Sequence, residues 1–261
     1  MRPNLLILGG TTEATALAQA AAARGVAGTV SFAGRVERPR RQPLPQRVGH
    51  FGGPAGLAAY LQDNGITHVI DATHPFAVQM SRNAVTACAD AGVPLLALTR
   101  PPWQPVAGDQ WIRVPDIAGA VAALDRPRAR VMLAVGRMHL SDFAANPQHA
   151  YLLRLVDPPK DALALPDAEI VVDRGPFGEA ADRALMDRHG IEVVVSKNAG
   201  GSATYGKIAA ARALGLPVIM IDRPKPPERA EVHDVAAALD WPDLAGPGHA
   251  GTGHAGTDRG V

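Results

Sequence analysis

The chain has 261 residues, of which 47% are hydrophobic and 20% charged, so it can bury the core of one large or two ordinary domains. Lys and Arg number 26 against 25 for Asp and Glu, and aromatic residues make up 4%. This balance argues against nucleic acid as a partner, because that binding needs a basic surface or aromatic stacking platforms. With one cysteine and no apolar run long enough to span a membrane, we expect a cytoplasmic protein without a disulfide, a membrane contact or a metal site.

Short apolar runs alternate with alanine-rich stretches along the chain, which is typical of βαβ units and a mostly parallel sheet. In the first part of the chain we expect strands at residues 4–8, 28–33, 47–51, 67–71 and 94–98, and helices at 12–24, 54–64 and 77–91. A glycine follows each of these helices directly, at the position where a left-handed cap favours it. The proline-rich segment from Arg100 to Pro105 then interrupts the alternation and marks the expected domain boundary.

The same alternation begins again after this boundary. We expect strands at residues 111–114, 129–135, 150–155, 168–173, 192–196 and 217–221, and helices at 116–124, 139–145, 178–189, 203–214 and 233–239. The predicted fold class is therefore α/β, with two Rossmann-like lobes in which helices flank mostly parallel sheets. The first lobe covers residues 1–101 and the second 102–244, and the composition of residues 245–261 is typical of a disordered tail.

A glycine-rich turn joins the first predicted strand to the first helix at Gly9, Gly10, Thr11 and Thr12. Glycines let the backbone approach a phosphate, and the N–H groups of a helix N-terminus attract it, so these residues are candidates for binding a dinucleotide. The full G-x-G-x-x-G pattern is absent, and a tight turn with Thr11 or Thr12 as the helix cap is the alternative.

The end of the second predicted strand indicates which dinucleotide would bind. Enzymes that use NAD usually carry an acidic residue there, whereas this strand has none and Arg35 follows it. Ser31 and Arg35 would meet a 2′-phosphate, which favours NADP(H) over NAD(H). The alternative is a solvated loop, since Arg38, Arg40 and Arg41 lie next in the chain among prolines.

A polar cluster of Asp71, Ala72, Thr73 and His74 follows the fourth predicted strand. Ligands of open α/β sheets bind at the carboxyl ends of strands, so this cluster is a second candidate binding segment. The alternative is structural, with Asp71 and Thr73 capping the next helix and His74 satisfied in the core.

A third candidate segment joins a strand to a helix in the second lobe, and its polar and glycine residues include Lys197, Asn198, Gly200, Gly201, Ser202 and Lys207. A flexible backbone, a helix N-terminus and ammonium groups together favour an anion. Arg137 and Arg174 each lie beside a glycine at other strand-to-helix turns, and with Lys197 they would line one sheet edge with cations. Either Arg alone would equally suit a surface ion pair.

Six segments, spread over residues 4 to about 224, together closely resemble the precorrin-6A reductase family of cobalamin biosynthesis. In chain order they are Gly-Gly-Thr-Thr-Glu-Ala (9–14), Asp-Ala-Thr-His-Pro-Phe-Ala (71–77), Arg-Pro-Pro-Trp (100–103), Gly-Arg-Met-His-Leu (136–140), Arg-Gly-Pro-Phe (174–177) and Lys-Asn-Ala-Gly-Gly (197–201). The second and the last are specific, whereas the glycine turn is not. The family often has Ser where this chain has Ala199, so a hydroxyl is not needed there.

The resemblance implies NADPH-dependent reduction of one macrocycle double bond, at C18–C19, which converts precorrin-6A to precorrin-6B. We expect the first lobe to bind NADPH through Gly9, Gly10, Thr11, Thr12, Ser31, Arg35, Asp71, Ala72 and Thr73. The acetate and propionate groups of a tetrapyrrole need spaced cations. We therefore expect the second lobe to bind substrate, together with His74, through Arg137, Arg174, Lys197, Asn198, Gly200, Gly201, Ser202 and Lys207.

For the proton that must accompany the hydride, His74 has the only pKa among the motif residues that suits donation near neutrality. We place it in the candidate catalytic set with Asp71 and Thr73, and solvent or a substrate carboxyl could donate in its place. The oxygen-independent branch of the family reduces the cobalt-containing macrocycle, and no motif here separates the branches. The residues also remain compatible with a reductase of small carbonyl compounds and with a non-catalytic NADP-binding sensor. Neighbouring pathway enzymes are expected as transient partners.

Overall fold

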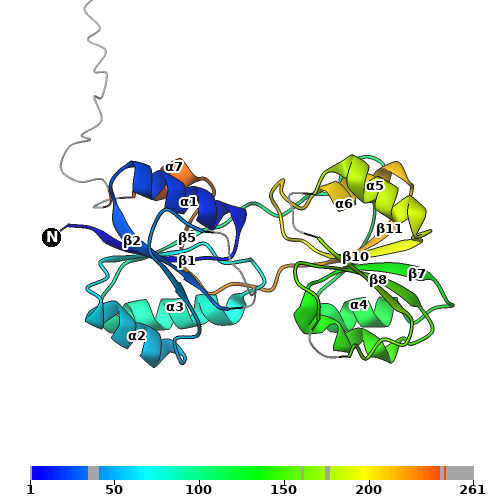
Figure 1. The fold of residues 1–261 in the computed structure, drawn as a ribbon, viewed down its shortest axis with the longest axis horizontal. Helices are drawn as coiled ribbons and strands as arrows, with labels where there is room; N and C mark the ends of the chain where they lie inside the picture. The colour runs from blue at the N-terminus through cyan, green and yellow to red at the C-terminus, as the bar shows by residue number, and fades with distance from the viewer. Residues whose placement is uncertain (1, 35–40, 160–161, 174–176, 242–243, 245–261) are drawn as a thin grey trace, which may run out of the picture.

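The chain folds into two α/β lobes that lie side by side along the long axis of the molecule (Figure 1). This computed structural model describes residues 2–34, 41–159, 162–173, 177–241 and 244. Each lobe contains one six-stranded sheet, and the paired strands in both sheets are parallel. The predicted fold class of two Rossmann-like lobes is therefore confirmed. The predicted tail at residues 245–261 lies outside the described residues.

The first sheet has the strand order β12-β5-β4-β1-β2-β3. Its strands are β1 (Asn4–Leu8), β2 (Ala27–Phe32), β3 (Gln46–Val48), β4 (His68–Asp71), β5 (Leu95–Leu98) and β12 (Ala230–Val232). One face is covered by α1 (Thr12–Ala23) and α7 (Val235–Leu239), and the other by α2 (Pro54–Asp63) and α3 (Val78–Ala91) (Figure 1). Helices on both faces explain why the inner strands are continuous apolar runs rather than alternating patterns.

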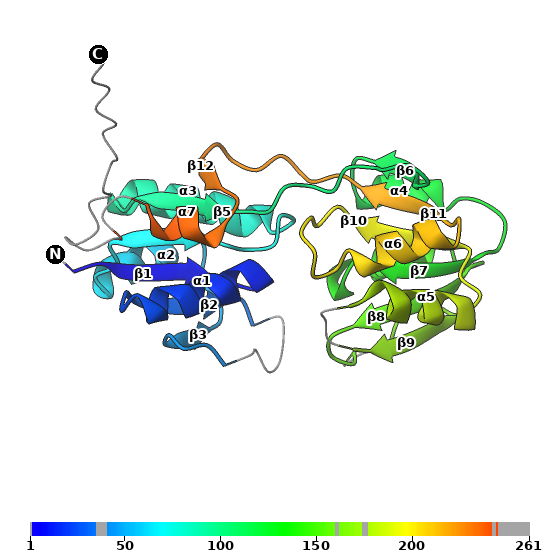
Figure 2. The ribbon, with the colours of Figure 1, turned by 90° about the horizontal axis from the view of Figure 1, so that it is seen from above.

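The second sheet has the strand order β6-β11-β10-β7-β8-β9. Its strands are β6 (Gln110–Val114), β7 (Arg130–Ala134), β8 (Ala150–Leu155), β9 (Ala168–Val172), β10 (Val193–Lys197) and β11 (Pro217–Ile221). Helices α5 (Glu179–Arg188) and α6 (Gly206–Ala213) lie on one face and α4 (Ile117–Ala123) on the other (Figure 1). Two chain segments connect the lobes, the first crossing (residues 99–109) and the second crossing (residues 222–229) (Figure 2).

The expected division at residues 101 and 102 needs a correction, because the end of the chain returns to the first lobe. β12 pairs with β5 in the first sheet, with Ala230 opposite Leu96, and α7 contacts α1. Ala238 and Leu239 are buried in the same core as β1. The second lobe therefore ends with β11 at Ile221, and the range 102–244 joins parts of both lobes.

Two predicted helices also differ from the structure. The segment predicted as a helix at residues 139–145 forms two 3₁₀ helices, η1 (Arg137–His139) and η2 (Ser141–Ala145), in which Leu140 N–H donates to Arg137 O and Phe143 N–H to Leu140 O. Leu140 and Phe143 are buried and pack this segment into the core of the second lobe. The helix predicted from residue 203 begins at Gly206, since the preceding residues form a turn in which Tyr205 N–H donates to Ser202 O at 3.2 Å.

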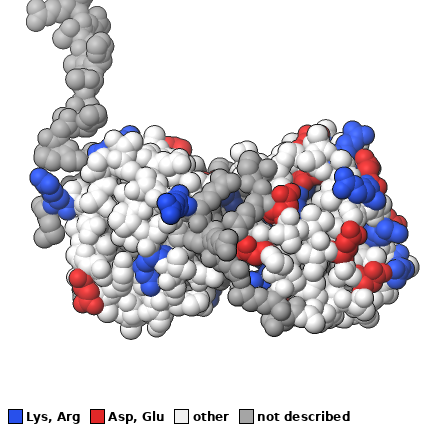
Figure 3. Space-filling view, in the orientation of Figure 1, with Lys and Arg blue, Asp and Glu red and all other residues white. Residues whose placement is uncertain are grey.

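Acidic and basic side chains are interspersed over the visible face of the second lobe (Figure 3). This face therefore carries no broad surface of one sign of the kind that attracts nucleic acid. Within the described part of the chain, no helix is both long and apolar enough to cross a membrane.

Candidate active site

The predicted glycine turn lies at the carboxyl end of β1 and begins α1. Gly10 adopts a φ of +126°, which favours glycine, and Gly9 N–H donates to Ser31 O at 2.8 Å. Thr11 is the helix cap, because its Oγ1 accepts from Ala14 N–H at 3.1 Å and donates to Ala72 O at 2.8 Å. The capping role considered for Thr11 is confirmed, and the turn is fixed against the segment after β4.

A cavity of about 150 Å³ lies beside this turn, where β1, β2, β3 and β4 end. Of the candidate coenzyme residues, it brings together Gly9, Ser31 and Thr73 from three strands. The segment from Gly49 to Gly53 also lines the cavity, and it was not predicted from the sequence as part of a site. Three glycines followed by Pro54 at the start of a helix were the signal for a further βα turn at the same sheet edge.

Arg47, in β3, supplies a positive charge beside the end of β2, and it is not among the residues predicted from the sequence. Its guanidinium carbon is 3.8 Å from the ring centroid of Phe51, and Nη1 donates to Ser31 Oγ at 3.0 Å and to Gly49 O at 3.1 Å. These contacts hold the group beside the 150 Å³ cavity. Arg35, which was predicted for this role, lies outside the described residues.

The expected catalytic role of Asp71 is not supported by its position. Its Oδ1 accepts from Thr73 N–H at 3.1 Å and Thr73 Oγ1 at 2.7 Å, and its Oδ2 accepts from Ser81 Oγ at 2.6 Å and pairs with Arg229. The side chain is 1% exposed. Because both oxygens are occupied by protein donors, Asp71 orders the turn after β4 and does not face a ligand.

His74 lies between the lobes, where charges from the second lobe and from both crossings act on it. Burial, together with Arg100, Lys197 and Arg223, lowers the pKa of His74 from 6.5 to about 3. Its Nδ1 accepts from Phe76 N–H at 3.3 Å, so the neutral ring carries its proton on Nε2. A pKa this low keeps the imidazole of His74 neutral near pH 7, which argues against the expected donation of its proton near neutrality.

In an NMR titration of the folded protein, we expect the imidazole of His74 to stay neutral from about pH 8 to about pH 5. Its pKa is lower in the folded chain than in the unfolded chain. Its contribution to stability is therefore complete above about pH 6.5 and is lost as the pH falls toward 3. His74→Gln, which has no such proton, should lose less stability between about pH 7 and about pH 5 than the unmodified chain. A resonance that titrates near neutrality and disappears in His74→Gln would contradict this result.

Lys197 and Arg137 lie at the carboxyl ends of neighbouring strands of the second sheet, as the predicted row of cations requires. Lys197 ends β10, and its Nζ is 5.3 Å from the ring centroid of Phe76 in the first lobe. Arg137 is exposed in η1, three residues after the end of the adjacent β7. Arg174 lies outside the described residues. The two described cations therefore line the carboxyl edge of the second sheet, and Lys197 faces the first lobe.

Two other predicted substrate ligands are used within the protein. Asn198 is buried, and its side chain accepts from Trp103 N–H at 2.8 Å and donates to Trp103 O at 3.0 Å. Lys207 is buried with its Nζ 2.6 Å from Thr204 O and 4.9 Å from the Trp103 ring centroid. Burial, together with the charge of Arg154, lowers the pKa of Lys207 to about 7. This geometry corrects the expectation that both side chains contact substrate directly.

The glycines of the same loop lie close to the first crossing. Gly200 is buried and Gly201 half-buried, while Ser202 is exposed at the tip of the loop. Gly201 and Ser202 line an open hollow of about 640 Å³ together with Trp103 and Phe177. Ser202 is therefore placed where a ligand could reach its hydroxyl, whereas Gly200 packs within the protein.

Two parallel sheets, one with glycine turns around a cavity and the other with cations at its carboxyl edge, define a two-lobed α/β protein of the Rossmann-like class. The family model described as precorrin-6x reductase CbiJ/CobK matches residues 4–243. The chain belongs to this precorrin-6x reductase family.

Individual relatives agree with this assignment. The precorrin-6A reductase of Rhodobacter capsulatus is 56% identical over 91% of this chain and 93% of its own length, and that of a Sinorhizobium species is 49% identical over 91% and 92%. The cobalt-precorrin-6A reductase of Priestia megaterium is 30% identical over 85% of this chain and 91% of its own length. The solved structure described as CobK precorrin-6A reductase superposes with a TM-score of 0.90 at 55% identity, covering 92% of this chain and 95% of that chain.

Proposed function

We propose that this chain reduces one double bond of the precorrin-6A macrocycle, at C18–C19, with NADPH as the reductant and precorrin-6B as the product. The observation that carries the proposal is the identity of 56% to a precorrin-6A reductase over nearly the whole of both chains. The cobalt-precorrin-6A reductase of Priestia megaterium reaches 30%, which favours the metal-free macrocycle as the substrate.

The first lobe fits a dinucleotide at the carboxyl edge of its sheet. Gly9 and Gly10 allow the backbone to approach a phosphate, and the N-terminus of α1 favours its negative charge. The cavity beside Ser31 and Arg47 offers a hydroxyl and a cation for a ribose phosphate. When bound there, NADPH would supply the hydride. The residues of this lobe would bind and orient it.

The second lobe fits a ligand that carries several carboxylates. Lys197 and Arg137 present cations at the carboxyl edge of that sheet, and Phe76 adds an apolar surface from the first lobe. Hydride transfer needs no protein nucleophile. The chain therefore has to hold the two reactants at the correct distance and orientation and to exclude water. The neutral His74 would donate a hydrogen bond from Nε2 to the substrate, and the proton would come from solvent or a substrate carboxyl.

The direct test is the anaerobic loss of NADPH absorbance with metal-free and cobalt-bound precorrin-6A in parallel reactions. We expect oxidation of NADPH with the metal-free macrocycle and a slower reaction with the cobalt form. Oxidation with simple aldehydes or ketones and none with either macrocycle would instead support a carbonyl reductase. Binding of NADPH without consumption would support a sensor.

Arg47→Ala is expected to weaken NADPH binding more than NADH binding. Loss of one charge-assisted contact to the 2′-phosphate costs about 1.5–3 kcal/mol, which is about one to two decades in the dissociation constant. Fluorescence titration with both coenzymes measures the ratio. Arg24→Ala is the matched control. Arg24 lies at the other end of α1, is 46% exposed and pairs with Asp240. Equal losses for NADPH and NADH would show that Arg47 does not read the phosphate.

A further inference from the structure

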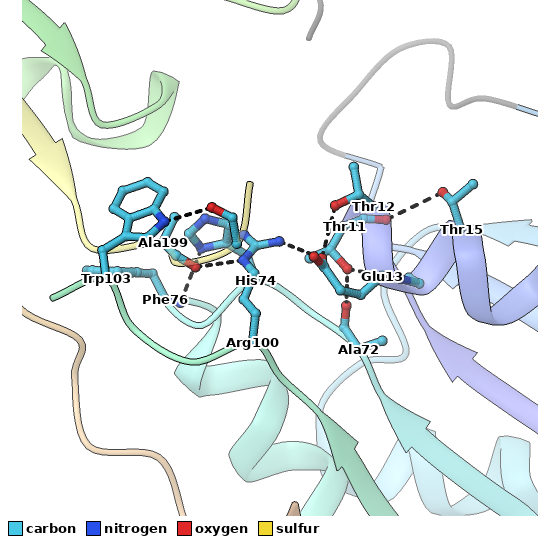
Figure 4. A network of polar contacts seen from close by, with 12 residues as sticks. Thr11, Thr12, Glu13, Thr15, Ala72, His74, Phe76, Arg100, Trp103 and Ala199 are labelled. Atoms are coloured by element: carbon cyan, nitrogen blue, oxygen red, sulfur yellow. Dashed lines mark hydrogen bonds and ion pairs between the residues drawn. The ribbon is translucent and has the colours of Figure 1, made fainter. Parts of the chain in front are cut away.

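Arg100 connects the candidate binding loops of the two lobes through one side chain (Figure 4). It lies in the first crossing, directly after Thr99. Its Nη1 is 2.5 Å from Glu13 Oε2 in the first turn of α1, and its Nε donates to Ala199 O, in the loop after β10, at 2.7 Å. The side chains of Arg100 and Glu13 are 11% and 24% exposed, so solvent ions screen this pair less than a surface pair.

The second crossing is fastened to the same loop. Arg223 donates from Nε to Asn198 O at 2.9 Å, from Nη1 to Arg100 O at 2.7 Å and from Nη2 to Ala199 O at 3.0 Å. Asn198 in turn holds the backbone of Trp103 in the first crossing. The loop after β10 is thus tied to both crossings, and the Arg100–Glu13 pair extends this connection to the glycine turn of the first lobe.

The two glycines of the loop allow this close approach. Gly200 and Gly201 have φ values of +68° and +70°. A Cβ on Gly200 would overlap Pro101 O, and one on Gly201 would overlap Cδ of Arg100. The Gly-Gly pair therefore serves contact with the first crossing, in addition to any contact with ligand.

We propose that Arg100 is a positioning residue. It holds the glycine turn of the first lobe and the loop after β10 at the distance and orientation that hydride transfer requires. The inference rests on the proposed function, in which one lobe binds the hydride donor and the other the acceptor. A contact that joins both lobes sets the distance between the reactants, on which the rate depends steeply.

Arg100 also has an electrostatic effect that can be separated from its geometric one. An anion at the N-terminus of α1 would be repelled by the carboxylate of Glu13 in the first turn, and the guanidinium offsets that charge. A lysine would keep the positive charge. It has one ammonium group on a flexible stem and cannot reproduce the fixed fork that contacts both Glu13 and Ala199 O.

The test compares Arg100→Gln, Arg100→Lys and the double variant Arg100→Gln/Glu13→Gln. In Arg100→Gln we expect the NADPH dissociation constant to rise about tenfold and kcat with precorrin-6A to fall by at least about tenfold. In Arg100→Lys the dissociation constant should stay near that of the unmodified chain while kcat falls. In the double variant NADPH affinity should recover while kcat stays low. Recovery of kcat in the double variant, or full kcat in Arg100→Lys, would overturn the proposal.

Hydrogen exchange without any ligand provides a readout that does not depend on turnover. Amides of residues 199–206 should exchange faster in Arg100→Lys than in the unmodified chain, and unchanged exchange would overturn the proposal. Arg128→Gln is the control, because Arg128 forms an exposed pair with Asp167 near the amino end of β7. This variant should change neither kcat nor the exchange of residues 199–206. If the unmodified chain binds NADPH but consumes none with precorrin-6A, the proposed function fails, whereas exchange still decides the role of Arg100.

Discussion

Asp71→Asn is expected to lower the free energy of unfolding by about 3–5 kcal/mol, because it removes the buried counter-charge of Arg229 and leaves that guanidinium only the partly exposed carboxylate of Glu231, at 3.4 Å. Arg229 is 9% exposed in the second crossing and pairs with Oδ2 of Asp71. That oxygen also accepts from Ser81 Oγ at 2.6 Å, and Oδ1 accepts twice from Thr73. An amide has only one acceptor atom, so at least one of these donors loses its partner. The pair also anchors β12, which begins at Ala230, directly after Arg229.

Urea unfolding followed by circular dichroism measures this loss, and Arg24→Gln is its control. The Arg24–Asp240 pair is exposed, with side chains 46% and 67% accessible, so its removal should change stability by about 0–1 kcal/mol. Hydrogen exchange should show that β12 opens first in Asp71→Asn, since its strand pairing depends on the residue beside it. Similar losses in the two variants would mean that the buried pair contributes no more than a surface one.

The regular part of the fold was predictable because its signals are local. β1, β8 and β11 begin and end at the predicted residues, since each is an apolar run bounded by Gly, Pro or polar residues. The glycine turn and the Lys197 loop were placed correctly at strand-to-helix connections for the same reason. A parallel sheet then brings such turns to one edge, so the location of both candidate sites follows from the alternation alone.

Three features that the sequence did not reveal depend on contacts between residues far apart in the chain. β12 has three residues and no apolar run, and it is held by pairing with β5, far earlier in the sequence. Arg47 reaches Ser31 only because β3 lies next to β2. The pKa of His74 is lowered by burial and by cations from both crossings and the second lobe. The residue type alone predicted proton donation by His74, whereas the lowered pKa argues against it.

Gly200→Ala is expected to destabilise the protein more than any other glycine substitution of the same φ, because two separate effects act there. A left-handed conformation costs an alanine about 1–2 kcal/mol. The added Cβ would also overlap a backbone carbonyl, that of Pro101, and overpacking of this kind costs about 1–3 kcal/mol more. A carbonyl in the first crossing cannot rotate away as a flexible side chain can, so relief requires the loop and the crossing to separate.

Comparison with Gly92→Ala separates the overlap of the Cβ from the cost of the left-handed conformation. Gly92 has a φ of +66°, close to the +68° of Gly200, but a Cβ there would meet nothing within 4 Å. The difference in unfolding free energy between the two variants therefore measures the close approach of the loop to the crossing, and equal losses would exclude it. Separation should also expose the Trp103 amide, which donates to Asn198 Oδ1 at 2.8 Å, so its hydrogen exchange should accelerate in Gly200→Ala and stay unchanged in Gly92→Ala. Because the same loop carries Lys197 at its start, the shift should raise the KM for precorrin-6A in Gly200→Ala while the NADPH dissociation constant changes less.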